Sequence, residues 1–221
     1  AAESASLDDL FLRLESVDVV MRIDTGALPS MAKTPTLGRW ELDLLRSIED
    51  VVRLGHVRHV SGAALVLERG EVRLPPRSVI VHCAASGLVY PPVVPIWGPD
   101  RIRLQTIRAG FPCFNAALAG YVEATRDDDA ERNRLCPANV LPDDPRSWAR
   151  MQVRGALATR SFAAEPDIAA WATGCALNPV RIDPSVRDDP DVAAAADRMA
   201  QHAPAGLARL SELSGEPLHG G

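Results

Sequence analysis

The stretch that decides the predicted fold is Val79-Ile80-Val81-His82-Cys83-Ala84-Ala85-Ser86-Gly87. Residues 78–83 form a short, β-branched apolar run, which is typical of a strand buried on both faces of a parallel sheet. The small side chains that follow let the backbone approach a flat or bulky ligand. Ligands in open α/β sheets bind outside the carboxyl ends of strands. We therefore predict a cofactor contact at Ala85, Ser86 and Gly87, although an ordinary strand exit with small packing residues would produce the same pattern.

The elements before this stretch alternate between helices and short strands. Leu7, Leu10, Phe11 and Leu14 recur at helical spacing after Ser6, which predicts an amphipathic helix over residues 6–14. The further predictions, in chain order, are a strand at 17–23, a loop at 25–36, a helix at 39–49, and strands at 56–60, 63–68 and 71–74. The last three strands form a β-meander, with a tight turn at residues 69–70.

The elements after this stretch become helical. We predict an irregular proline-rich segment at 90–99, a strand at 101–107, and helices at 112–125, 147–162, 167–173 and 191–213, the last interrupted at residues 204–206. The composition shifts near residue 126 from mixed to alanine-rich. The predicted fold is therefore α/β, with a β-meander in residues 1–126 and a mostly helical region in residues 127–221.

Composition excludes several classes of protein. The chain has 221 residues, of which 47% are hydrophobic, and a net charge of −5, so we expect a packed core and no nucleic-acid partner. Apolar runs fall short of a membrane span, and residues 1–6 lack the features of a signal peptide. Cys83, Cys113, Cys136 and Cys175 are too widely spaced for a zinc site, so we expect reduced thiols in a cytoplasmic protein.

Several stretches resemble a known superfamily. They are residues 48–55, 81–88, 114–118 and 121–136, of which the acidic segment that ends at Cys136 is the most specific. Together with the meander, they resemble the carboxyl-terminal part of FAD/NAD(P)-binding oxidoreductases of the pyridine-nucleotide-disulfide and flavin-monooxygenase kind, and in particular uncharacterised actinobacterial-type members, over about residues 7–175. In that superfamily a buried strand ends in a small-Thr-Gly turn beside the flavin. Here the turn reads Ala85-Ser86-Gly87, with serine in place of threonine.

The chain departs from that superfamily at its dinucleotide fingerprint. G-x-G-x-x-G, whose backbone amides hold the pyrophosphate at a helix amino terminus, does not occur in the sequence. Either the chain is the carboxyl-terminal portion of a longer protein or it has lost cofactor binding. The resemblance implies that residues 1–126 form an incomplete Rossmann-like FAD/NAD(P)-binding sheet with the β-meander, followed by the helical region of residues 127–221. It also implies an oxidoreductase that uses FAD, possibly with NAD(P), acts on a small molecule, and completes its cofactor site with an upstream segment or a second chain.

A second candidate contact lies at residues 110–115. This segment opens the predicted helix at 112–125, and a helix amino terminus favours an anion or a flavin carbonyl. We therefore include Phe114 and Asn115 among the predicted cofactor-binding residues, with ordinary capping and packing as the alternative.

Other polar residues carry no strong signal for catalysis or metal binding. His56 and His59 would point to opposite faces of a strand, and residues 127–129 read as a solvated helix cap. The catalytic residues and the substrate stay unknown. Two other functions remain open: a non-catalytic scaffold subunit that binds through the helices of residues 147–213, and a hydrolase that uses Ser86, which lacks the G-x-S-x-G elbow.

Overall fold

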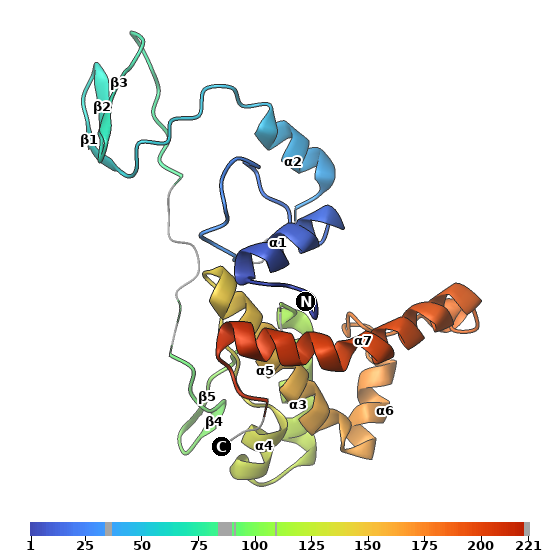
Figure 1. Cartoon of the computed structure of the whole chain (residues 1–221). Helices are drawn as coiled ribbons and strands as arrows, with labels where there is room; N and C mark the ends of the chain where they lie inside the picture. The colour runs from blue at the N-terminus through green and yellow to red at the C-terminus, as the bar shows by residue number, and fades with distance from the viewer. Residues whose placement is uncertain (34–36, 84–89, 91, 109, 219–221) are drawn as a thin grey trace. The chain divides into compact units, whose positions relative to one another are not determined.

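A computed structural model describes the whole chain except residues 34–36, 84–89, 91, 109 and 219–221 (Figure 1). The chain divides into two compact units. Unit 1 comprises Ala1–Thr36 and Pro91–Gly221, and unit 2 comprises Leu37–Tyr90. Helices and short antiparallel sheets make up the described part, and the region after residue 126 is mostly helical. The predicted mixture of helix and sheet and the helical carboxyl-terminal region are confirmed. The predicted boundary near residue 126 falls inside unit 1.

Unit 1 is built from helices joined by one small hairpin. Ser6 begins the first helix, because its hydroxyl accepts a hydrogen bond from the backbone N–H of Asp9 at 3.1 Å. The elements are α1 (Leu7–Ser16), β4 (Trp97–Gly98), β5 (Arg101–Ile102), α3 (Pro112–Thr125), α4 (Asp129–Leu135), α5 (Pro145–Ala163), α6 (Pro166–Gly174), a short 3-10 helix (Pro184–Val186) and α7 (Pro190–Ser214). The predicted helices at 6–14, 112–125, 147–162 and 167–173 are confirmed to within a few residues.

The main core of unit 1 forms around α3. Phe114, Leu118 and Val122 recur every four residues on this helix, and each is at most 1% exposed. They pack with residues from α4, α5, α6 and the segment before α3, among them Ile96, Ile107, Leu135, Phe162 and Ile168. Because burial of one large aliphatic side chain contributes about 1.5–3 kcal/mol, this cluster is the main source of stability in unit 1.

A smaller core joins α1 to α5 and α7. Phe11 meets the ring of Trp148 edge-on, with centroids 5.3 Å apart, and Leu210 and Leu213 of α7 pack beside it. Figure 1 shows α7 lying across α5. The predicted interruption of α7 at residues 204–206 is wrong, because the helix continues through Pro204 to Ser214. A proline removes only one backbone hydrogen bond from a helix, and packing of the following turns offsets that loss.

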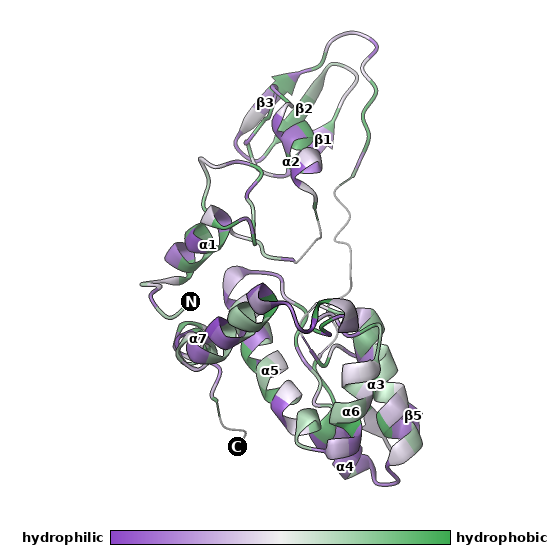
Figure 2. Ribbon diagram, turned by 90° about the vertical axis from the view of Figure 1, so that its right-hand side faces the viewer, coloured by the Kyte–Doolittle hydropathy of each residue, from purple (hydrophilic) through white to green (hydrophobic). Residues whose placement is uncertain are grey.

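Unit 2 contains one helix and the β-meander. The helix is α2 (Arg39–Arg46), and the three antiparallel strands are β1 (Val57–Val60), β2 (Ala64–Leu67) and β3 (Gly70–Arg73), in the order β1-β2-β3. The meander is therefore confirmed, with its second turn at residues 68–69. A bulge in β1 keeps Val57 opposite Leu67 and Val60 opposite Leu65. Figure 2 shows β2 as the most hydrophobic of the three strands.

The predicted buried strand at residues 78–83 is wrong for the described part of the chain. Residues 78–83 have no regular secondary structure, and Val79 and Val81 are 88% and 74% exposed. Pro75 and Pro76 precede the run, and no described strand lies beside it to accept its backbone hydrogen bonds. All strand pairs in the described residues are antiparallel, so they include no Rossmann-like parallel sheet.

Two further predicted strands are also absent or shorter. Residues 17–23 form turns and bends, and the strand predicted at 101–107 is limited to β5. In both segments the apolar residues alternate as in a strand. A strand also needs a neighbouring strand for its backbone groups, and side-chain amides take that place at Trp97, Ile107 and Arg108.

Candidate functional site

Buried and partly buried asparagine side chains hold segments of residues 93–108 against the helices of unit 1. Asn133 of α4 accepts a hydrogen bond from the backbone N–H of Trp97 at 3.1 Å and donates one to its carbonyl at 2.8 Å. Asn139 donates to the carbonyls of Ile107 and Met151 at 3.3 and 3.0 Å. These amides satisfy backbone groups that a partner strand would otherwise satisfy, so the segment is fixed without belonging to a larger sheet.

Asn115, one of the predicted cofactor-binding residues, makes the same kind of contact. Its Oδ1 accepts from the backbone N–H of Arg108 at 3.0 Å, and its Nδ2 donates to the carbonyl of Arg108, also at 3.0 Å. The side chain is 3% exposed. Its amide is therefore engaged in positioning residue 108 at the start of the loop that leads into α3.

Phe114, the neighbouring predicted residue, belongs to the core of unit 1. Its ring stacks on Trp171 with centroids 6.0 Å apart and meets Phe162 edge-on at 6.2 Å. It is 1% exposed. Because an aromatic ring buried on several sides has no free face, Phe114 can support a site only by shaping the helix on which that site stands.

Asn115 thereby holds the backbone of Arg108, and the next feature of the site is the guanidinium of Arg108. It is half-buried, and burial lowers its pKa below the ordinary value of an arginine. Its Nη1 donates to Oδ1 of Asn178 at 3.3 Å, and its Cζ lies 5.7 Å from the ring centroid of Phe111. Arg108, Asn178 and Phe111 thus bring a cation, an amide and a half-exposed ring together, with Asn115 holding the backbone of Arg108. We call this group the Arg108 corner.

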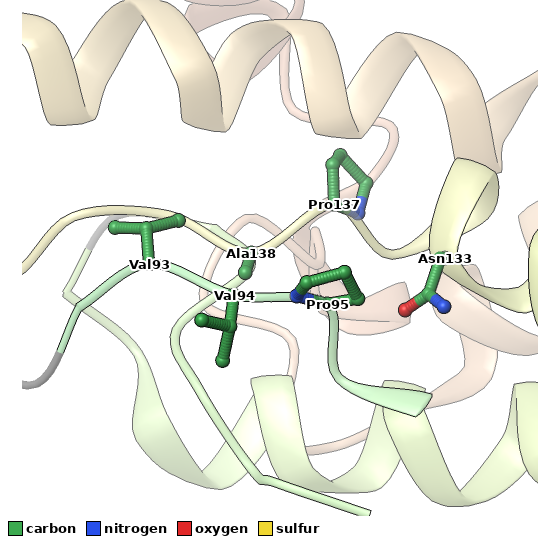
Figure 3. Close-up of a pocket in the computed structure, with 6 residues that line it drawn as sticks. All are labelled: Val93, Val94, Pro95, Asn133, Pro137 and Ala138. Atoms are coloured by element: carbon green, nitrogen blue, oxygen red, sulfur yellow. The ribbon is translucent and has the colours of Figure 1, made fainter. Parts of the chain in front are cut away.

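A separate cavity of about 250 Å³ lies beside the proline-rich segment (Figure 3). Its lining comes from two stretches of chain and from one helix: Val93, Val94, Pro95, Pro137, Ala138 and Asn133 of α4. The lining carries no titratable side chain, and the amide of Asn133 is engaged with Trp97. This cavity can hold an apolar group, but its own side chains supply no acid, base or nucleophile.

The thiols and carboxylates of the described residues also favour structural roles. Burial raises the pKa of the Cys136 thiol to about 12, so it stays protonated and unreactive at neutral pH. Asp128 accepts hydrogen bonds from the N–H groups of Ala130 and Glu131, which confirms residues 127–129 as a helix cap. In the described ranges, no three His, Cys, Asp or Glu side chains gather as a metal site would require.

The principal predicted contact cannot be placed. Ala85, Ser86 and Gly87 lie outside the described residues. His82 and Cys83, the last residues that the structure describes before this turn, are exposed. Across the part of the chain that the structure describes, no helix is both long enough and apolar enough to cross a membrane.

Comparison with known proteins finds mycobacterial relatives. The chain is 34% identical over 175 residues to the uncharacterized proteins Rv2000 of Mycobacterium tuberculosis and Mb2023 of Mycobacterium bovis. The match covers 79% of this chain and 33% of each relative, so the chain spans about a third of the length of the curated relatives that it matches. No protein-family model matches the chain, and no solved structure matches it.

Sequence reasoning did not identify Arg108 as a candidate site residue. Asn178 is 70 residues away along the chain, and only the fold brings the two side chains together. One local signal was present: Arg108 precedes Gly110, whose positive φ of 71° marks a turn before α3. An arginine beside such a turn and an exposed phenylalanine was a reasonable candidate for a binding residue.

Proposed function

We propose that this chain is the carboxyl-terminal portion of a flavin- and NAD(P)-dependent oxidoreductase, which completes its cofactor site with an upstream segment or a second chain. The observation that carries the proposal is the exposed run Val79-Ile80-Val81. Its side chains are 88%, 45% and 74% exposed, and successive residues of an extended chain face opposite sides. Apolar residues on both faces are typical of a central strand of a parallel sheet.

The proposal accounts for the exposure of such a run in the structure. A strand that is buried on both faces needs neighbouring strands and covering helices, and the described residues supply neither for residues 79–81. In the proposed complete protein, this run joins the Rossmann-like sheet of the cofactor domain. The turn at residues 85–87 then lies beside FAD, as the superfamily resemblance implies. The relatives, about three times as long as the matched region, have room for such a domain.

Expression of the complete coding region tests this function. We expect it to encode a glycine-rich dinucleotide-binding segment, and the purified protein to be yellow, with bound FAD released on denaturation. A complete coding region without such a segment, whose product remains colourless after incubation with FAD, would refute the proposal.

A pair of variants makes the test specific to the exposed run. Val81→Asp places a charge where the proposed sheet forms, so the complete protein should lose its flavin. Val19→Asp places the same charge at a residue of unit 1 that is 63% exposed, and flavin content should not change. Equal flavin content in the two variants would count against a buried strand at residues 79–81.

A non-catalytic scaffold subunit is the second candidate. It is favoured by the first half of α7, where Met199 is 68% exposed and residues 193–196 are all alanine. Such a helix can approach another helix closely. A stable hetero-complex of the chain, without flavin in the complete protein, would favour this function over the first.

A further inference from the structure

The Arg108 corner differs from the most buried ion-paired arginines of unit 1 in what surrounds the guanidinium. Arg126 contacts Glu131, Glu165 and Asp167, and its side chain is 15% exposed. Arg132 contacts Glu123 and Asp129, and Arg22 contacts Glu15. These three arginine side chains, which are 14–19% exposed, are therefore each matched with carboxylates, as electrostatics requires of a desolvated charge.

The side chain of Arg108 is partly buried without such a carboxylate partner. Within the described residues, no carboxylate lies in ion-pair range of its guanidinium, and its side-chain partners there are the neutral amide of Asn178 and the ring of Phe111. An amide oxygen and a ring face attract a cation, but they do not neutralise it. The corner therefore retains an uncompensated positive charge in a chain whose net charge is −5.

The geometry of the corner limits which anion fits. A guanidinium presents five N–H donors in a planar fork that matches two oxygens of a phosphate or carboxylate. One donor is directed to Asn178, and the backbone of Arg108 is held from the other side by Asn115. The fork is thus held in place before a ligand arrives, which lowers the entropic cost of binding.

Phe111 adds a preference for a ligand that carries a ring. Its side chain is 41% exposed, although it stands directly before a helix whose first aromatic residue, Phe114, is buried. An exposed ring beside a fixed guanidinium provides a stacking surface and a charge within one small region. Phosphate and a flat heterocycle occur together in nucleotides.

We infer that the Arg108 corner is a nucleotide-binding site, in which Arg108 binds a phosphate group and Phe111 contacts the base. The choice of a nucleotide rests on the proposed function, whereas the anion site rests on the contacts of Arg108 alone. The inference assigns a binding role to Arg108, Phe111 and Asn178.

Calorimetric titration of the whole chain at low ionic strength tests this site. The probes are ADP, inorganic pyrophosphate and adenosine, each up to about 10 mM, which detects even millimolar dissociation constants. We expect ADP to bind more tightly than pyrophosphate, and adenosine to bind weakest. Arg108→Gln should weaken ADP binding about tenfold or more, because a charge-assisted pair is lost.

Two further variants keep the result interpretable. Arg103→Gln removes the same charge from an exposed arginine in the same segment, and ADP binding should stay within about twofold of the original chain, as expected for an exposed charge. Arg108→Lys keeps the charge but loses the fork, so ADP binding should fall to an intermediate value. If Arg108→Gln does not fold, the loss of ADP binding in Arg108→Lys provides the test instead.

Each alternative outcome overturns the inference. Absence of ADP binding, equal binding by the Arg108 and Arg103 variants, or adenosine binding as tight as ADP would each exclude a phosphate site at Arg108. Pyrophosphate binding as tight as ADP would exclude the contact of Phe111 with a base. These results are independent of flavin in the complete protein, so the failure of one proposal can be distinguished from the failure of the other.

Discussion

Replacement of Asn115 by alanine tests how the Arg108 corner is held. The change removes an acceptor for the N–H of Arg108 and a donor to its carbonyl, both at 3.0 Å. A buried polar group that loses its partner costs about 1–3 kcal/mol. The two bonds are only partly buried, so water can replace part of each. We therefore take the lower part of that range for each group and expect a total loss of about 2–3 kcal/mol in the free energy of unfolding.

Urea denaturation followed by tryptophan fluorescence measures this loss. Trp97, Trp148 and Trp171 all lie in unit 1, so the signal mainly reports the unit that contains Asn115. With a denaturant slope of about 1–3 kcal/mol per molar urea, the midpoint should fall by about 0.7–3 M.

A second substitution and a control complete the experiment. Asn115→Asp keeps the size of the side chain but places an acceptor against the carbonyl of Arg108, so it should destabilise unit 1 at least as much as alanine does. Cys113→Ala changes an exposed residue in the first turn of the same helix and should have little effect. If Asn115→Ala unfolds within about 0.5 kcal/mol of the original chain, the size expected of a neutral surface change, the amide does not hold Arg108 as described.

Three further predictions concern other parts of unit 1. Gly120→Ala, on an exposed turn of α3 where an added Cβ meets nothing within 4 Å, should stabilise the chain by about 0.5–1 kcal/mol in the same urea assay, and a destabilised variant would show a hidden clash. Cys136, with its pKa raised to about 12, should resist alkylation at pH 8 while the exposed Cys83 is modified, as mass spectrometry of peptides can show; equal labelling would contradict its burial. The contact with Arg126 lowers the pKa of Asp167 below 3.8, so this pair stabilises the fold above the unfolded pKa and the contribution is lost as pH falls through the folded pKa. Arg126→Met should return the Asp167 pKa, measured by NMR titration, towards 3.8, and an unchanged value would show that the ion pair is not its cause.

The helices were predictable because their signals are local. The spacing of Phe114, Leu118 and Val122 alone locates α3, since apolar residues that recur every three to four positions are typical of one buried helix face. The meander was predictable for a similar reason. Its strands are adjacent in the sequence and are joined by short turns, so each strand finds its partner within a few residues.

The absence of a strand at residues 78–83 could not be predicted from the sequence, because whether a strand forms depends on its neighbouring strands. An apolar, β-branched run has the same composition whether or not a partner strand lies beside it, and in the described residues none does. The candidate site was only partly predictable. Asn115 was identified as important, but its contact proved to be with the backbone of Arg108, and the approach of Asn178 depends on how α6 and the following loop pack.

One contact in unit 1 affects how the chain can fold during its synthesis. Arg209 of α7 donates to the carbonyls of Ser4 and Ala5, more than 200 residues earlier. A ribosome adds about 5–20 residues per second, so α1 emerges roughly 10–40 s before the residues that complete its packing. During that interval Leu10 and Phe11 lack Leu210 and Leu213, their partners on α7. A newly made chain therefore leaves this apolar surface without its α7 partners until α7 is made.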